Sequence, residues 1–190
     1  LFQLPNFVMG PMANPLYHDI GLTKDVVAAI RSSVGLIAVF LGIAAGGFVC
    51  ARLDSRTALI VGGSMQIIGT MAYAALPYVH DLVTFGAIMA LDNFGIAMAG
   101  VTLVTYMSGL TSLGYTATQY ALLTSTYAWA GKILKGFSGA VVDWLSASHG
   151  LMQAYAIFFV GAGLIGVPAL ILFALLHRWQ RPAEVPAVPG

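Results

Sequence analysis

The sequence predicts an all-α membrane protein, a bundle of apolar helices, on the strength of three observations. First, 59% of its 190 residues are hydrophobic and only 8% are charged, with a mean hydropathy of +0.88, whereas soluble domains carry roughly 25% charged residues. Second, apolar runs of the length that crosses a bilayer, about 20 residues per helix, recur along the chain. Third, the connections between these runs are short and rich in Gly, Pro, Asn, Asp and Ser, and they leave no room for a soluble domain.

Taken in order, the apolar runs predict one truncated helix followed by five complete spans. The truncation is expected because Leu1 is not an initiator Met, and the first residues are apolar without the basic region of a signal peptide. The Pro-rich end, residues 179–190, is expected to be a flexible cytoplasmic tail. The predicted spans are 1–14, 26–50, 58–79, 83–107, 119–142 and 152–177, and they form one bundle over residues 1–178.

Positive charges in the short loops predict the orientation of the bundle. Arg52 and Arg56 lie between the second and third runs, and Arg178 and Arg181 follow the last run. If the helices alternate in direction, all four arginines lie on one side, and Lys and Arg gather on the cytoplasmic side of membrane proteins. The sequence therefore predicts a multi-pass protein with its C-terminus in the cytoplasm. The second run also carries a small-xxx-small pattern, Gly42 to Gly46, which is typical of closely packed helices.

Several function classes are excluded by composition. The formal net charge is +1 and no basic block is present, so nucleic-acid binding has no electrostatic basis. Cys50 is the only cysteine, and no Cys/His spacing typical of a metal site accompanies it. We expect no cofactor, no metal ion and no nucleic-acid partner.

Charged residues within the apolar runs are the candidates for function. Asp92 lies about nine residues, ~14 Å, from the outer end of its span, and Lys132 lies about 13 residues, ~20 Å, from the inner end of its own. Across a hydrocarbon core of ~30 Å these depths nearly coincide. Lys135 lies one turn from Lys132 on the same face. A charge at such a depth is costly and normally has a polar partner or a watery cavity beside it.

Two hypotheses explain these charges: an ion-paired network, or a polar cavity that receives an anionic solute and protons from the outer face. Two lysines outnumber the single deep carboxylate, which favours the cavity. Arg31, about five residues inside its span, and Asn93 complete the candidate substrate or proton pathway with Asp92, Lys132 and Lys135. We expect Asp92 to alternate between binding a proton and pairing with Lys132.

An intramembrane serine protease is the alternative from a different class. The stretch GFSG, Gly136 to Gly139, matches the GxSG pattern of rhomboid-type proteases and would make Ser138 the nucleophile. Such a serine needs a general base within hydrogen-bond reach. However, His177 lies at the opposite end of the following helix and His149 lies in a loop, so we expect a protein that is not an enzyme.

Three stretches resemble a known family: FVMGPMANPLYHDIGLTKDVVA, LDNFGIAMAG and SLGYTATQYALLTSTYAWAGKILKGFSGAVVDWL. They are similar to the C-terminal half of AmpG-type muropeptide permeases of the major facilitator superfamily, and the resemblance runs from about Phe7 to the end of the last helix. The loop GFVCARLDSR weakly resembles a glycine and arginine turn of that superfamily. Ala51 stands where an acidic residue is common, which puts a charge-relay gate at this loop in doubt.

The resemblance implies twelve helices in two six-helix halves, with this chain as the second half starting inside helix seven. It implies proton symport of anhydro-muropeptides, the sugar-peptide fragments of peptidoglycan recycling, across the bacterial inner membrane. The carboxylates of such a solute would pair with Lys132, Lys135 and Arg31, and the missing N-terminal half would be the partner in the bilayer. The alternatives left open are a related acetyl-CoA or other anion transporter and a nonfunctional remnant, which the DNA upstream of Leu1 would distinguish.

Overall fold

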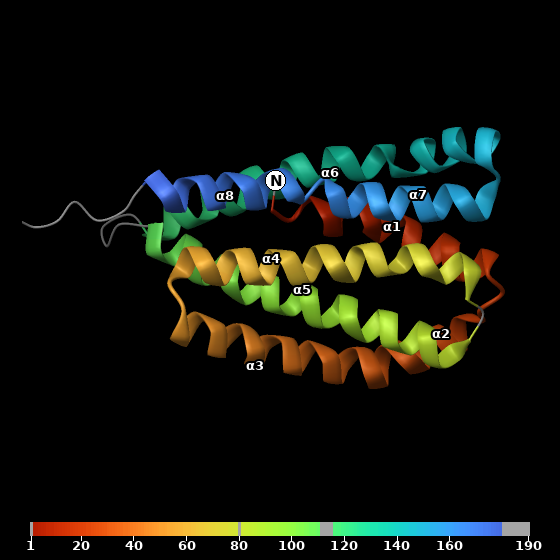
Figure 1. Ribbon diagram of the computed structural model, residues 1–190, viewed down its shortest axis with the longest axis horizontal. Helices are drawn as coiled ribbons and strands as arrows, with labels where there is room; N and C mark the ends of the chain where they lie inside the picture. Colours follow the sequence, from red (N-terminus) through yellow and green to blue (C-terminus); the bar gives the residue numbers. More distant parts are fainter. Residues whose placement is uncertain (1, 80, 111–115, 180–190) are drawn as a thin grey trace, which may run out of the picture.

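The computed structural model describes residues 2–79, 81–110 and 116–179, and these residues are helical throughout apart from short turns (Figure 1). A π-helical turn, Arg31–Gly35, joins the second helix to the third, and a 3-10 turn, Tyr73–Tyr78, follows the fourth. The α-helices are α1 (Leu4–Asp19), α2 (Lys24–Ile30), α3 (Leu36–Arg52), α4 (Ser55–Ala72), α5 (Leu82–Leu110), α6 (Thr116–His149), α7 (Leu151–Leu164) and α8 (Val167–Trp179).

Four helical segments within the described ranges are long and apolar enough to cross a membrane. They are Lys24–Arg52, Ser55–Tyr78, Leu82–Gly109 and Leu151–Leu175. The predicted span 119–142 forms most of α6 but is not one of the four, because its Ser, Thr and Lys residues make it more polar than its neighbours. The chain is an all-α membrane protein, as its composition predicts.

Two predicted loops are partly helical. α1 continues to Asp19, beyond the predicted end near residue 14, and α6 continues to His149 instead of ending near residue 142. Both extensions lie beyond the apolar run, where a helix tolerates charged residues in the polar layer of the bilayer. The chain then turns at Gly21 (φ 84°) and Gly150 (φ 81°), a conformation that costs glycine little because it has no Cβ. The predicted tail lies almost entirely outside the described residues.

Helix starts and breaks follow from single side chains. Asp54 caps α4 by accepting a hydrogen bond from the Thr57 backbone N–H at 3.1 Å, which satisfies one of the free N–H groups of the first turn. Pro168 lies just after the turn that separates α7 from α8. It explains the break, because a proline ring clashes with the carbonyl group four residues earlier and proline has no backbone N–H to donate.

Glycines set the closest contacts in the bundle, on both sides of α5. A Cβ at Gly46 of α3 would lie 3.0 Å from the Val101 Cβ, and a Cβ at Gly42 would overlap the backbone of α5. The close packing predicted from Gly42 and Gly46 is therefore confirmed. On the other side, a Cβ at Gly69 of α4 would lie 2.7 Å from the Asp92 Cα.

The remaining helices pack against this trio. α7 lies against α4, and α1 lies against both α6 and α7. At the end where α1 meets α2, an aromatic core forms: Tyr17 packs edge-on against Phe85, with ring centroids 5.1 Å apart, and Tyr73 stacks on Phe159 at 5.4 Å. All four rings are buried.

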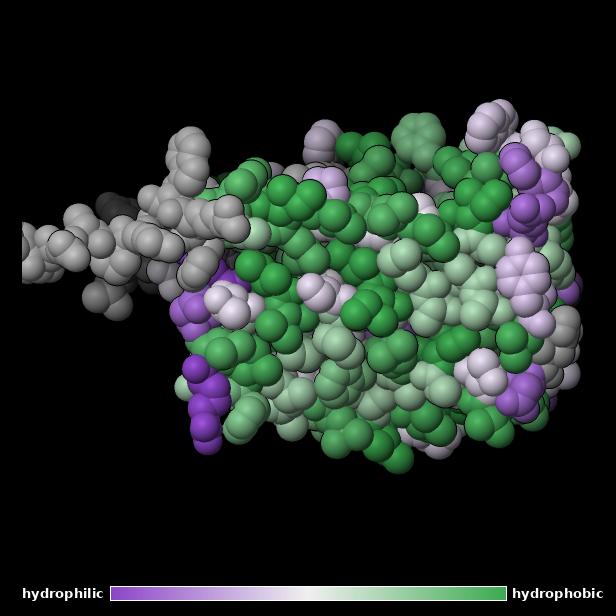
Figure 2. Space-filling model, viewed as in Figure 1, coloured by the Kyte–Doolittle hydropathy of each residue, from purple (hydrophilic) through white to green (hydrophobic). Residues whose placement is uncertain are grey.

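The surface supports a membrane location. Figure 2 shows a broad hydrophobic band across the middle of the visible face, with the most hydrophilic residues gathered at its two ends. Large apolar side chains of α3 are exposed, among them Ile37 (61%), Phe40 (64%) and Phe48 (61%). Exposed apolar surface of this extent is unusual for a soluble monomer and is what a lipid-facing helix requires.

Candidate functional site

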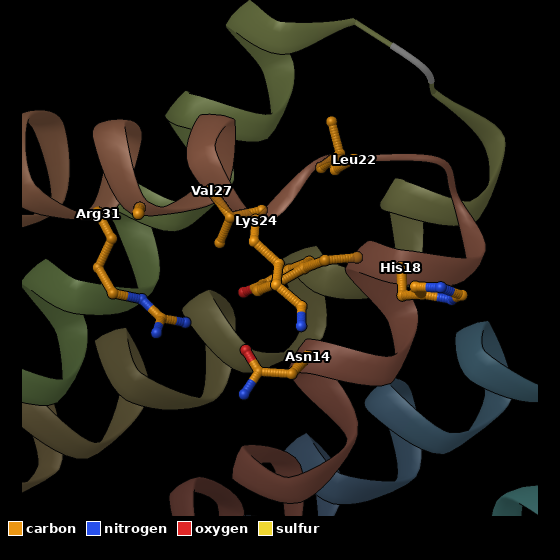
Figure 3. A pocket seen from close by; sticks show the side chains of 8 residues that line it. Asn14, His18, Leu22, Lys24, Val27 and Arg31 are labelled. Atoms are coloured by element: carbon orange, nitrogen blue, oxygen red, sulfur yellow. The ribbon is translucent and has the colours of Figure 1, made fainter.

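A basic cavity opens where α1 meets α2, and we call it the α1–α2 cavity. Its volume is about 330 Å³. Figure 3 shows that Lys24 and Asn14 approach each other across it, that the Arg31 guanidinium extends into the same space, and that His18 extends away from it. Such a combination of cations and an amide suits a carboxylate or another anion. The lining residues are Asn14, Tyr17, His18, Leu22, Lys24, Val27, Ala28 and Arg31.

Arg31 lies on an irregular turn of its span. It begins the π-helical turn Arg31–Gly35, where the hydroxyl groups of Ser33 and Ser32 donate to the Ala29 carbonyl oxygen at 2.6 and 3.1 Å. π-helical turns inside α-helices are rare and occur frequently at functional sites. Arg31 is exposed and has no carboxylate partner within ion-pair distance among the described residues.

Asp92 is buried at the crossing of α4 and α5, with 3% of its surface exposed. The absence of a side chain at Gly69 brings the two helices together over it. Its Oδ1 atom has no hydrogen-bond partner among the described residues, and Tyr73 lies one helical turn beyond Gly69 on the side of α4 that faces it. A buried carboxyl group within a membrane span is a candidate functional residue.

Tyr73 connects Asp92 to the α1–α2 cavity. The Tyr17 hydroxyl group donates to the Tyr73 hydroxyl oxygen at 3.0 Å, and both tyrosines are buried, with 3% and 2% of their surface exposed. Tyr17 also lines the cavity together with Arg31. The hydrogen-bonded tyrosine pair thus lies between the cavity and the crossing of α4 and α5 that holds Asp92.

Asn93 faces a different neighbour from Asp92. Its side-chain amide donates to the Met89 carbonyl oxygen at 2.7 Å, and a Cβ at Gly35 would lie 3.6 Å from its Nδ2. Successive helical residues point about 100° apart, so Asp92 faces α4 while Asn93 faces the span that contains the π-helical turn. Asn93 is half-buried in that interface.

Lys132 and Lys135 lie on the exposed side of α6. The opposite side of this helix packs on α1: Gly131 lies against the Phe7 ring, and the buried Ser138 hydroxyl group donates to the Val8 carbonyl oxygen at 2.9 Å. Among the described residues, neither lysine has an ion-pair partner. The pairing of Lys132 with Asp92 therefore stays a prediction about another conformation of the protein.

Lys132 borders an open groove of about 550 Å³ together with Ser125, Thr126, Ala128 and Trp129. Trp129 is 70% exposed and lines this groove. A tryptophan ring and an ammonium group side by side present one apolar face and one positive charge to the same ligand.

The protease alternative has no support in the geometry. Ser138 uses its hydroxyl group to bind α1, and only 2% of its surface is exposed. His149 ends the same helix eleven residues later, about 16 Å away along the axis. No group of three His, Cys, Asp or Glu residues placed to hold a metal ion occurs in the described part of the chain.

The two tyrosines are the site residues that the sequence did not point to. Tyrosines near the ends of apolar runs are typical of the interfacial belt of membrane proteins, and Tyr17 and Tyr73 fit that pattern. Only the packing of α1 against the end of α4 shows that their hydroxyl groups meet each other. Tyr73, a hydroxyl-bearing residue within the predicted span 58–79, is the only sequence signal for this pair.

Comparison with known proteins identifies relatives along almost the whole chain. A Rickettsia felis protein named as a transporter, AmpG 4, is 31% identical over 180 residues, which is 93% of this chain and 41% of that protein. The anhydromuropeptide permease of Escherichia coli (strain K12) is 28% identical over 173 residues, or 90% of this chain and 34% of the permease. A Rickettsia prowazekii protein named AmpG 3 is 24% identical over 94% of this chain and 41% of its own length.

No protein-family model matches the chain. The names of these relatives describe transport rather than catalysis, in agreement with the prediction of a protein that is not an enzyme. The chain spans 34–41% of the length of these relatives. Homology over at least nine tenths of its residues shows that the chain is a partial-length relative of the AmpG-type permeases.

Proposed function

We propose that this chain forms the C-terminal half of a transporter of the major facilitator superfamily that imports anhydro-muropeptides into the cytoplasm, driven by protons. The observation that supports this proposal best is a set of three cations in the part of the chain that aligns with the AmpG relatives. Arg31, Lys132 and Lys135 have no carboxylate partner among the described residues. A solute with several carboxylates would supply the missing negative charge. A second half-bundle would cover the exposed side of α6, because solute sites of such transporters form between two halves.

The proposed orientation follows from the two ends of the bundle. Arg52 and the loop between α3 and α4 lie at the end opposite the α1–α2 cavity (Figure 1). Since Lys and Arg in short loops mark the cytoplasmic side, the cavity opens toward the periplasm of the bacterial inner membrane. Arg31 and Lys24 would then meet an anionic solute as it enters. The C-terminus is cytoplasmic in this arrangement.

The test is uptake by the full-length protein that contains this chain. Purified protein in lipid vesicles is given radiolabelled anhydro-muropeptide, with and without an inward proton gradient. We expect uptake that depends on the gradient and is not reduced by excess acetyl-CoA. Absence of uptake under both conditions would refute the assignment. Competition by acetyl-CoA at comparable concentration would instead favour the related anion transporter.

A further inference from the structure

Three buried polar groups form a continuous path from the α1–α2 cavity to the centre of the bundle. Tyr17 begins the path because it lines the cavity. Its hydroxyl group is hydrogen-bonded to that of Tyr73 at 3.0 Å, and Tyr73 lies one helical turn beyond Gly69, the residue that packs against Asp92. All three side chains are at most 3% exposed. The path crosses from α1 to the turn after α4 and then to α5.

From this geometry we infer that Tyr17 and Tyr73 form the proton path by which Asp92 is charged from the outer cavity. The inference rests on the proposed transport function and adds the route of the coupling ion. A proton from water in the cavity adds to the Tyr17 hydroxyl oxygen. The original Tyr17 proton passes to the Tyr73 oxygen, and the original Tyr73 proton passes to the Asp92 carboxylate. Each tyrosine keeps one proton, and one net proton reaches Asp92.

The chemistry of the two hydroxyl groups allows this transfer. A tyrosine hydroxyl group can accept one hydrogen bond and donate another, so Tyr73 can be bonded to Tyr17 at 3.0 Å and donate toward Asp92. The cations Lys24 and Arg31 line the mouth of the path together with Tyr17.

Polar groups also continue inward from Asp92. Gln66 Oε1 and Thr70 Oγ1 of α4 are buried and, like Asp92 Oδ1, have no hydrogen-bond partner among the described residues. Gln66, Thr70 and Tyr73 recur at intervals of four and three residues, so they lie on one face of α4 and the turn that follows it. Buried polar atoms are normally satisfied. These side chains extend the polar face of α4 inward from Tyr73.

The hydroxyl groups can be removed without changing the aromatic packing. Phenylalanine at position 17 or 73 keeps the ring contacts with Phe85 and Phe159. A matched control exists on α7: Tyr155 is also 3% exposed and its hydroxyl group donates to Asp19 Oδ2 at 2.7 Å. That bond lies outside the path. Tyr155→Phe therefore removes the hydroxyl group of a similarly buried tyrosine ring and should leave proton transfer unchanged.

The primary experiment follows protonation of Asp92 by time-resolved infrared spectroscopy after a pH jump, in the full-length protein in lipid vesicles. The carboxyl band that disappears in Asp92→Asn is assigned to Asp92. We expect Tyr73→Phe and Tyr17→Phe to slow the appearance of this band at least about tenfold, because a positioned proton donor accelerates transfer by such factors or more. Tyr155→Phe should match the wild type. Proton-driven solute uptake should fall in parallel, while solute exchange without net proton movement should persist.

The outcomes test the proton path and the muropeptide solute independently. A wild-type rate in both path variants, or the absence of a titrating Asp92 band between pH 4 and 9, overturns the proton path even if the protein imports muropeptides. Slow protonation in the path variants of a protein that does not take up muropeptide leaves the path intact and refutes the solute. If Tyr73→Phe elutes as aggregate on size exclusion, Tyr17→Phe decides.

Discussion

The close contact between Gly69 and Asp92 leads to a quantitative prediction about stability. In Gly69→Ala, the new Cβ would lie 2.7 Å from the Asp92 Cα and 3.2 Å from the Leu91 carbonyl oxygen. Since carbon atoms pack at about 3.5–4.0 Å, α4 and α5 would have to separate by roughly 1 Å. Inserting one carbon into a packed interface typically costs about 1–3 kcal/mol. We expect a loss of unfolding free energy in that range.

Gly100 of α5 provides the matched control, because no atom lies within 4 Å of the position of a Cβ there. Gly100→Ala should be neutral or stabilising by up to about 1 kcal/mol, the difference in helix propensity between the two residues. The assay is denaturant unfolding of the full-length protein in detergent micelles, followed by tryptophan fluorescence. Equal stability of the two variants would refute the argument that Gly69 holds α4 and α5 together over Asp92.

Three further predictions follow from single contacts. Lys132→Ala should lower solute uptake at least about tenfold, and Lys132→Arg should restore part of it, because a charge-assisted hydrogen bond contributes about 1.5–3 kcal/mol; equal uptake by all three proteins would remove Lys132 from the pathway. Ser138→Ala should cost about 0.5–1.5 kcal/mol of unfolding free energy, because it removes the buried hydrogen bond from α6 to the Val8 carbonyl oxygen of α1; unchanged thermal unfolding would contradict this. Hydrogen bonds from the backbone N–H and the hydroxyl group of Thr84 lower the pKa of Asp81 below its ordinary value of 3.8. A lowered pKa stabilises the folded state above pH 3.8 and loses this effect as the pH falls through the folded-state pKa, so melting temperatures of wild type and Asp81→Asn should converge in acid, and a constant difference down to pH 2 would disprove it.

The helices of this chain could be predicted from the sequence because length and hydropathy alone define a membrane helix. The contact made by Gly42 and Gly46 was also visible, since two small residues four apart share one helix face. The helix ends were less predictable. α1 and α6 continue past their apolar residues, because turn-forming residues do not end a helix until a glycine such as Gly21 or Gly150 reverses the chain.

The candidate site was only partly predictable, because depth and direction are separate properties of a helical residue. Counting residues places Asp92 and Lys132 at similar depths, but each residue turns the helix by about 100°. In the structure Asp92 points into the crossing of α4 and α5, whereas Lys132 lies on the exposed side of α6. Rotation about a helix axis is set by tertiary packing. The bond between Tyr17 and Tyr73, 56 residues apart, depends on the same packing.

The glycine contacts on both sides of α5 also determine how the bundle can move. α3, α5 and α4 approach backbone to backbone at Gly42, Gly46 and Gly69, so few flexible side chains lie between them that could adjust to a sliding motion. We expect these three helices to travel as one rigid plate during a transport cycle. The compliant joints then lie outside the plate, at the π-helical turn Arg31–Gly35 and at the break before Pro168.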